Sequence, residues 1–221
     1  MITHLIDKKD TFQIVRDQIA AILKLNVTNQ MSLAAASGKD ETLWDLRVFS
    51  ERNNPWEEFQ DAEGPKPPIV NVWYDSSDFD DAGSSSVNNQ KTNAMYNVDI
   101  YACGVSAETA EGHSSGDESA ALTLHNAACL VRNILMAGVY TYLGLRGTVW
   151  GRKVTAVNIF QPSADNATVQ NIIGARISFR VTFTEESPQV DSVLLEAIAI
   201  QVDRAENGEI LVQMEYPING S

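Results

Sequence analysis

Apolar residues recur at helical spacing over two long stretches of the chain. The first runs from Asp10 to Leu25 and the second from Ser115 to Leu145. Residues three and four apart share one face of an α-helix, so each stretch predicts an amphipathic helix with a buried face. The second helix would be about 40 Å long at about 1.5 Å per residue, enough to lie across a small sheet. Its apolar stripe consists of Leu124, Ala127, Ala128, Val131, Ile134, Leu135, Val139 and Tyr142.

Signals typical of helix ends accompany both stretches. Asp10 with Gln13, and Ser115 with Glu118, have the three-residue spacing of a capping box at a helix N-terminus. Gly144 tolerates the left-handed conformation that commonly follows a helix, so the second helix is expected to end there.

Alternating apolar and polar residues predict strands elsewhere. The clearest alternation lies in Thr168–Glu185, where Ala175, Ile177, Phe179, Val181 and Phe183 alternate with polar residues. One face of that strand is therefore expected to be core, and the other to be wet or to meet a neighbour. Further strands are expected at Ile69–Asp75, Asn93–Gly104, Arg152–Gln161, Leu194–Asp203 and Ile210–Tyr216.

The order of these elements predicts an α+β fold. We expect a mostly antiparallel sheet with one long and one shorter helix packed on one face, plus extended hairpins. The main domain covers residues 1–188 and contains an insertion at 26–68, where breaker residues dominate and only Thr42–Ser50 suggests a short helix or strand. Residues 189–221 form a C-terminal β-hairpin extension, whose turn contains Asn207 and Gly208.

Composition limits the classes of function. The 221 residues include 29 acidic and 16 basic side chains, for a formal charge of −13 that repels nucleic-acid phosphates. No sequence-specific nucleic-acid binding is therefore expected. The chain has no run of about 18 apolar residues, so no membrane span is expected. Cys103 and Cys129 have no metal-ligand spacing and no leader precedes them, which favours synthesis in a reducing cytoplasm.

Catalytic signals are scarce. His4, His113 and His125 have no partner at the spacing of metal ligands or of a catalytic pair. The predicted role of His125 is structural or exposed, with a catalytic acid or base as the unsupported alternative. We therefore expect a protein that is not an enzyme and that needs no cofactor and no metal.

An acidic loop follows the strand at Ile69–Asp75. Carboxylate oxygens of this kind bind hard cations such as Mg²⁺ or Ca²⁺, but the loop lacks the residue order of an EF-hand. A solvated loop is the favoured interpretation and a weak cation site the alternative. The acidic residues are Asp75, Asp78, Asp80 and Asp81.

The arrangement of elements resembles the tail-terminator, or tail-completion, proteins of tailed bacteriophages. The shared pattern covers residues 10–186: an N-terminal helix, a hairpin over Ile69–Cys103, a long helix over Asp117–Leu143 and a hairpin over Val154–Phe183. The stretch that resembles the last strand of that family's sheet reads Val169-Gln-Asn-Ile-Ile-Gly-Ala-Arg-Ile-Ser-Phe-Arg-Val-Thr-Phe-Thr-Glu-Glu.

The resemblance implies a structural virion protein. Such a protein forms a ring, expected to be a hexamer, that caps the tail tube, ends its polymerisation and joins the tail to the head. The implied partners are further copies of the chain, the tail tube protein, the head–tail connector or neck proteins and, as a possibility, a sheath protein. The implied location is the tail or neck of the virion.

Two groups of residues are candidates for these contacts. The acidic loop is expected to face the channel, where negative charge would keep passing DNA from adhering. A closed ring uses two different patches on each subunit, and strand edges are good candidates for them. The candidate subunit or tail interface consists of Arg176, Arg180, Asn207 and Gly208.

Three other interpretations remain open at this stage. A neck or tube-related structural protein would have a similar pattern of elements. A small metal-dependent or hydrolytic enzyme would use the 75–81 acidic loop and His113. A monomeric adaptor or immunity-type module would bind a partner without forming a ring.

Overall fold

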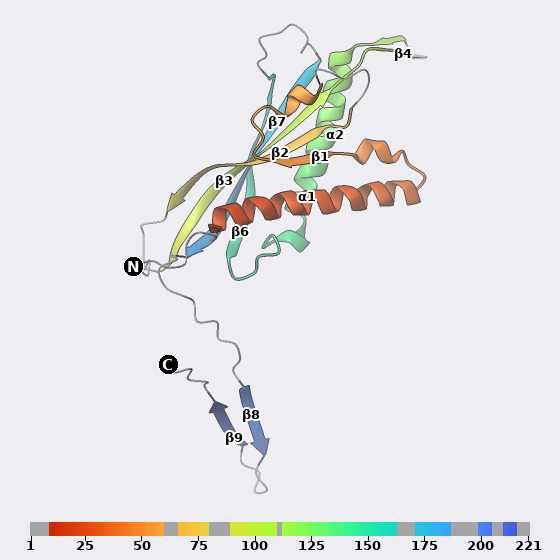
Figure 1. Ribbon diagram of the computed structural model, residues 1–221. Helices are drawn as coiled ribbons and strands as arrows, with labels where there is room; N and C mark the ends of the chain where they lie inside the picture. Colours follow the sequence, from red (N-terminus) through yellow and green to blue (C-terminus); the bar gives the residue numbers. More distant parts are fainter. Residues whose placement is uncertain are drawn as a thin grey trace. The chain divides into compact units, whose positions relative to one another are not determined.

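A computed structural model of the chain describes residues 9–59, 66–79, 89–109, 112–162, 171–186, 199–204 and 210–215. The chain divides into two units, Met1–Ser187 and Pro188–Ser221. The first unit contains a five-stranded sheet with the strand order β1-β2-β3-β7-β6 (Figure 1). Its strands are β1 (Arg47–Ser50), β2 (Ile69–Phe79), β3 (Asn89–Cys103), β6 (Val149–Phe160) and β7 (Ile172–Glu186).

Two small sheets complete the strands. In the first unit β4 (Ala107–Thr109) pairs with β5 (Gly112–Ser114). In the second unit β8 (Ala199–Arg204) pairs antiparallel with β9 (Ile210–Glu215), in the segment where the sequence predicts a hairpin.

The predicted α+β class is confirmed. The pairs β2–β3, β3–β7 and β7–β6 are antiparallel, as expected. The sheet is nevertheless mixed, because β1 runs parallel to β2 at one edge. The short 3₁₀ helix η2 (Pro55–Phe59) lies in the connection that returns the chain to the start of β2.

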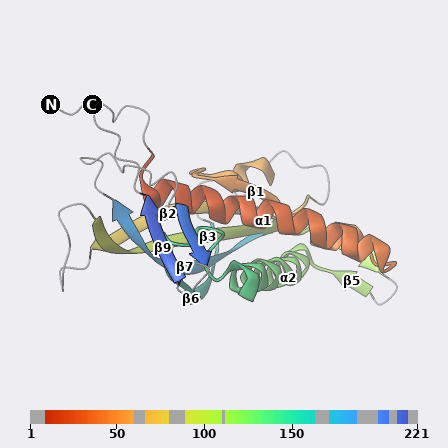
Figure 2. The same ribbon diagram turned by 90° about the horizontal axis from the view of Figure 1, so that it is seen from below.

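Two helices cover one face of the sheet, with α1 (Thr11–Ala36) lying across the strands and α2 (Gly116–Met136) beside it (Figures 1 and 2). The apolar residues that face the helices alternate along β3 and β7, as the sequence pattern predicts. The middle of the sheet is buried on both faces, because residues 69–72 of β2 and residues 96–102 of β3 are all buried. The Tyr96 hydroxyl donates a hydrogen bond to the Phe12 carbonyl at 3.0 Å, which joins α1 to β3. The largest fully buried side chains of this core include Tyr96, Phe179, Phe183, Ile19, Leu23, Leu124 and Leu135.

Helix α1 is longer than the pattern predicts. It continues past Leu25 to Ala36. Val27 and Ala34 extend the buried face of the helix beyond Leu23. The polar side chains in this half satisfy themselves locally: the Thr28 hydroxyl donates to the Lys24 carbonyl at 3.1 Å and the Ser32 hydroxyl to the Thr28 carbonyl at 3.1 Å. Such residues disfavour a helix in sequence-based prediction, and tertiary burial overrides that preference here.

Helix α2 is shorter than predicted, ending at Met136 rather than at Gly144. Ala137 adopts an extended conformation, and the 3₁₀ helix η3 (Gly138–Tyr140) follows it. The Arg152 guanidinium of β6 donates to the carbonyls of Ala137, at 2.6 Å, and Tyr140. A long-range cation therefore satisfies the carbonyl of the C-terminal cap of α2. Gly144, the predicted end, has the expected left-handed conformation with a φ of 73°, but it lies beyond η3.

The two predicted capping boxes have different outcomes. At α1 the Asp10 N–H donates to Gln13 Oε1 at 3.2 Å, as expected. At α2 the Ser115 side chain makes no capping hydrogen bond. The Asp117 carboxylate instead accepts the Glu118 N–H at 3.0 Å. Hydrogen bonds from Ser115 and from that N–H lower the pKa of Asp117 below its usual value.

The segment 26–68 is less irregular than expected. Apart from the second half of α1, it contains the 3₁₀ helix η1 (Glu41–Trp44) and strand β1, which together correspond to the short element predicted at Thr42–Ser50. Leu46 and Phe59 of this segment are buried. The segment therefore supplies an edge of the main sheet. Within the part of the chain that the structure describes, no helix has the length and apolar character needed to cross a bilayer.

Candidate interaction face of the sheet

The face of the sheet opposite the two helices is the candidate functional surface, and we call it the outer face. Its side chains come from alternate positions of four strands. The register aligns Asn71, Asp99, Arg176 and Asn158 in one row across β2, β3, β7 and β6. A neighbouring row consists of Trp73, Asn97, Ser178 and Ala156.

Hydrogen-bonded side chains join β3 and β7 across this face. The Thr182 hydroxyl donates to Asn93 Oδ1 at 2.7 Å, and the Ser178 hydroxyl donates to Asn97 Oδ1 at 3.1 Å. Asn97 is only 4% exposed although no helix covers it, because neighbouring side chains of the same face shield it. Buried polar groups cost little when their partners are present, so these pairs join β3 to β7 on this part of the outer face. Elsewhere on the same face, Trp56 and Phe59 of η2 pack against Tyr101.

Arg176 and Asp99 form the electrostatic centre of the outer face. The guanidinium donates twice to the carboxylate, from Nε to Oδ1 at 2.7 Å and from Nη2 to Oδ2 at 2.8 Å. The Trp73 indole also donates to Asp99 Oδ2, at 2.9 Å. The side chain of Asp99 is 4% exposed and that of Arg176 is 39% exposed. Hydrogen bonding to Asp99 raises the pKa of Arg176 above its ordinary value.

Aromatic rings surround this ion pair. The Arg176 guanidinium carbon lies 4.9 Å from the ring centre of Trp73 and 5.7 Å from that of Phe160. Tyr101 meets Phe160 edge to face, with ring centres 5.8 Å apart. Burial, reinforced by the charge of Asp99, raises the pKa of Tyr101 to about 12. Phe160 lies over Gly174, whose missing side chain leaves room for the ring.

A shallow groove of about 240 Å³ lies beside the ion pair, with Arg176 and Asp99 in its wall. Asn71 forms another part of the wall and is almost fully buried. Its amide donates to the Arg52 carbonyl at 2.8 Å and accepts the Arg52 N–H at 3.1 Å. Asn71 thereby fixes the loop after β1 against the sheet.

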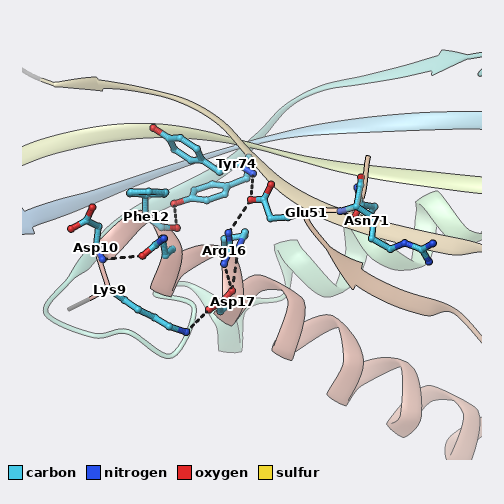
Figure 3. Close-up of polar contacts among 11 residues, drawn as sticks. Lys9, Asp10, Phe12, Arg16, Asp17, Glu51, Asn71 and Tyr74 are labelled. Carbon is cyan, nitrogen blue, oxygen red and sulfur yellow. Dashed lines mark hydrogen bonds and ion pairs between the residues drawn. The ribbon is translucent and has the colours of Figure 1, made fainter. Parts of the chain in front are cut away.

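Glu51 lies in the wall of this groove, in the turn after β1. Its φ of 55° is one that side-chain-bearing residues rarely adopt. Its Oε1 accepts from the Tyr74 N–H at 3.1 Å and from Arg16 Nη1 of α1 at 3.0 Å (Figure 3). One carboxylate therefore connects α1, the turn after β1 and strand β2, and these contacts compensate for the backbone conformation.

Two like charges lie side by side farther along the outer face. Arg180 of β7 and Lys153 of β6 are register partners, and both are exposed. With the residues that the structure describes, neither makes an ion pair or a hydrogen bond. Like charges directly opposite each other destabilise a sheet. Negative charge from another molecule would therefore stabilise this basic pair.

Strand β6 is an edge of the sheet, paired on one side with β7. Its first half is irregular, because the register shifts between Val149 and Gly151 and again between Val154 and Ala156. Its last five residues, 156–160, pair regularly and carry no charge. Val157 and Ile159 are 47% and 49% exposed although they lie on the face that bears the helices, as register partners of Ile177 and Ala175. Bulges and charges protect edges from pairing, and this half of β6 has neither.

The structure separates the residues that the sequence grouped as candidates. Asp75 and Asp78 are exposed and belong to strand β2, with Asp75 at a register shift. Asp80, Asp81, Asn207 and Gly208 lie outside the described residues. Arg176 is held by Asp99 within the same chain, whereas Arg180 is exposed on the outer face. Their assignment to a channel or to an interface stays a prediction.

The histidines do not join these groups. His113 Nδ1 lies 3.0 Å from Glu108 Oε1 in an exposed pair between β4 and β5. His125 is exposed on α2. Across the described ranges, no group of three or more His, Cys, Asp or Glu side chains converges as metal ligands would.

Sequence reasoning missed Asp99, Trp73 and Glu51 as parts of this face. The signal for Asp99 was present, because a carboxylate in the middle of a strand alternates with buried residues and Arg176 holds the matching place in the next strand. The cross-strand register that brings them together is not readable from the sequence. Comparison of the chain with protein-family models and with curated proteins finds no match.

Proposed function

We propose that this chain is a structural protein of a bacteriophage virion, which caps the end of a tail tube, ends its polymerisation and joins tail to head. The observation that supports this best is the outer face itself. It combines hydrogen-bonded polar side chains with aromatic rings, and its central ion pair is already formed within the chain, so it offers contact area and exposed charge. The order of helices and hairpins, α1, β2–β3, α2 and β6–β7, supports the same proposal.

Self-association into a ring, which we take to be a hexamer, would use two different patches on each copy. The regular half of β6 is one candidate, because an exposed edge accepts a strand from a neighbour. The basic pair Arg180 and Lys153 is a second, because a copy whose formal charge is −13 presents acidic surface to its neighbours.

The remaining partners in this proposal are the tail tube protein, the head–tail connector or neck proteins and, in a contractile tail, a sheath protein. The acidic residues Asp75, Asp78, Asp80 and Asp81 would face the channel and repel DNA. In this proposal the protein is not an enzyme, and its place is the tail or neck of the virion.

The test is to locate the protein and then to break its proposed contact. Tails assembled with the wild-type chain are imaged by electron microscopy, and the expected result is a ring at the head-proximal end of the tube. The double variant Lys153→Glu and Arg180→Glu should fold normally, because both side chains are exposed, but should leave tails of uncontrolled length.

A matched control makes the same change of charge elsewhere. Lys24 and Arg132 are exposed on the two helices, so Lys24→Glu with Arg132→Glu should preserve normal tails. Normal tails from the first variant would contradict the proposed contact. A ring found along the tube or within the neck would assign the chain to a tube or neck component instead.

A further inference from the structure

A second concave site lies on the opposite side of the molecule from the outer face. Helices α1 and α2 and the 3₁₀ helix η1 enclose a half-open groove of about 550 Å³, which we call the helix groove. Pockets of this volume are typical of sites that hold a small molecule or a short peptide segment. Its apolar lining includes Leu43, Trp44, Leu130 and Ile134.

The helix groove is uncharged although one residue in five of the chain is charged. Its remaining wall is rich in side-chain amides. A charged ligand would lose its water there without gaining a partner, which is costly. The amide residues are Asn26 and Gln30 of α1 and Asn126 and Asn133 of α2.

Several of these polar groups have no partner. The Trp44 indole nitrogen is buried and donates to no acceptor within the described chain. Gln30 and Asn126 make no side-chain hydrogen bond to any residue that the structure describes. An unpaired buried donor costs roughly 1 to 3 kcal/mol, so an occupant whose acceptor oxygen reaches Trp44 would recover that cost. Gln30 is half-buried and Asn126 is exposed, so both are accessible to the same occupant.

We propose that the helix groove binds an extended, uncharged, apolar segment of a partner protein. A side-chain amide has one carbonyl and one N–H group, as a backbone peptide unit has, so the two can pair reciprocally. An extended segment exposes its peptide units along its length, whereas a helix bonds them internally. The apolar lining then receives the side chains of the segment, and Leu43, now 66% exposed, becomes covered.

This proposal is independent of the ring and of the outer face. In the structure Asn26 already donates to the Tyr140 hydroxyl at 2.7 Å and Asn133 to Cys129 Sγ at 3.5 Å. These two amides are therefore held in place by α2 and the η3 segment that follows it. Gln30 and Asn126 remain available, one on each wall, to recognise the segment.

The test uses the full chain labelled with ¹⁵N and a capped tripeptide, acetyl-Ala-Leu-Ala-N-methylamide, as the probe. Titration should shift the indole N–H resonance of Trp44 and the side-chain amide resonances of Gln30 and Asn126. The same peptide with glutamate in the middle should bind more weakly by about tenfold, because the groove cannot pair its charge.

Matched variants separate recognition from folding. Asn126→Asp puts a carboxylate in the wall of the groove and should weaken binding of the neutral peptide by about tenfold. Asn29→Asp makes the same chemical change on an exposed position of α1 outside the groove and should leave binding unchanged.

Three results would overturn the proposal. The first is a Trp44 resonance that does not move when the peptide is added. The second is equal peptide binding by Asn126→Asp and Asn29→Asp. The third is a groove that binds hexanol but not the peptide. The last result would assign the groove to small neutral amphiphiles.

Discussion

At the scale of single residues, the outer face depends on the pairing of Arg176 with Asp99. Arg176→Met keeps much of the packing on Trp73 but leaves a nearly buried carboxylate without its cation. We expect the free energy of unfolding to fall by about 2 to 3 kcal/mol, less than for a fully buried pair because water reaches the half-exposed guanidinium. Urea unfolding at pH 7 measures this loss.

The control for that variant removes the second arginine of the same face. Arg180 lies four residues after Arg176 on the same face of β7. Arg180→Met removes an exposed cation and should change the free energy of unfolding by no more than about 0.5 kcal/mol. Equal losses from the two variants would contradict the assigned role of Arg176.

Tyr101 makes the stability of the fold sensitive to alkali. Its pKa is raised to about 12 in the folded chain, against about 10 in an unfolded one. The unfolded chain therefore releases this proton first as the pH rises. The stabilisation is fully present below pH 10 and is lost between about pH 10 and pH 12.

The expected loss from this single tyrosine is about 3 kcal/mol, because one pKa unit corresponds to about 1.4 kcal/mol. Tyr101→Phe should remove that part of the alkaline decline in unfolding free energy. The buried Tyr96, whose pKa burial also raises, is present in both proteins and cancels from the comparison. A Tyr101→Phe variant with the wild-type slope above pH 10 would show that Tyr101 ionises freely in the folded state.

At the scale of elements, the contact between the end of β3 and the start of α2 depends on Gly104. A Cβ atom at this position would lie 1.9 Å from the Gly116 carbonyl oxygen and 2.5 Å from the Ala120 nitrogen, both backbone atoms. Gly104→Ala must therefore push α2 away from the sheet, and we expect a loss of about 2 to 3 kcal/mol.

Gly138→Ala is the matched control for that substitution. A Cβ at Gly138 would meet no atom within 4 Å. The free energy of unfolding of Gly138→Ala, measured in urea, should therefore stay within about 0.5 kcal/mol of wild type. If Gly104→Ala is as stable as Gly138→Ala, α2 is not held against β3 as tightly as the structure indicates.

The sequence pattern predicts the interiors of elements better than their ends. The alternation in β3 and β7 identified the buried residues because one sheet face meets a continuous core. The end of α2 was not predicted because it involves a distant residue. Arg152 of β6, 16 positions after Met136, donates a hydrogen bond to the carbonyl of Ala137, the residue after the helix. The polar half of α1 was missed because its helix depends on burial of Val27 and Ala34. Local propensity does not contain such long-range causes.

The candidate site was predictable only in part, for the same reason. Alternation in β7 separated a core face from a face that is wet or meets a neighbour, and it placed Arg176 and Arg180 on the latter. The alternation did not distinguish Arg176, which pairs with Asp99, from Arg180, which makes no ion pair with the described residues. That difference arises from the register between β7 and β3. The turn at Glu51, which forms part of the groove beside Arg176, follows the short element predicted at Thr42–Ser50 and lies where breaker residues predict only irregular structure.

At the scale of the whole molecule, charge opposes the assembly that we propose. Each copy carries a formal charge of −13, so copies repel one another over the Debye length. That length shortens from about 30 Å at about 0.01 M salt to about 8 Å at about 0.15 M. Self-association of the purified chain should therefore strengthen over this range of NaCl concentrations, as measured by sedimentation velocity.

The basic pair makes this prediction specific to one surface. Lys153 and Arg180 supply local attraction for an acidic neighbour, so exchanging both for glutamate adds repulsion at the contact as well as net negative charge. That variant should remain monomeric at both salt concentrations, whereas the control with Lys24→Glu and Arg132→Glu should still associate at the higher one. Association that weakens with salt in the wild type would mean that attraction between the basic pair and acidic surface outweighs the overall repulsion between copies. The contact would then depend on the basic pair and not on the uncharged edge of β6.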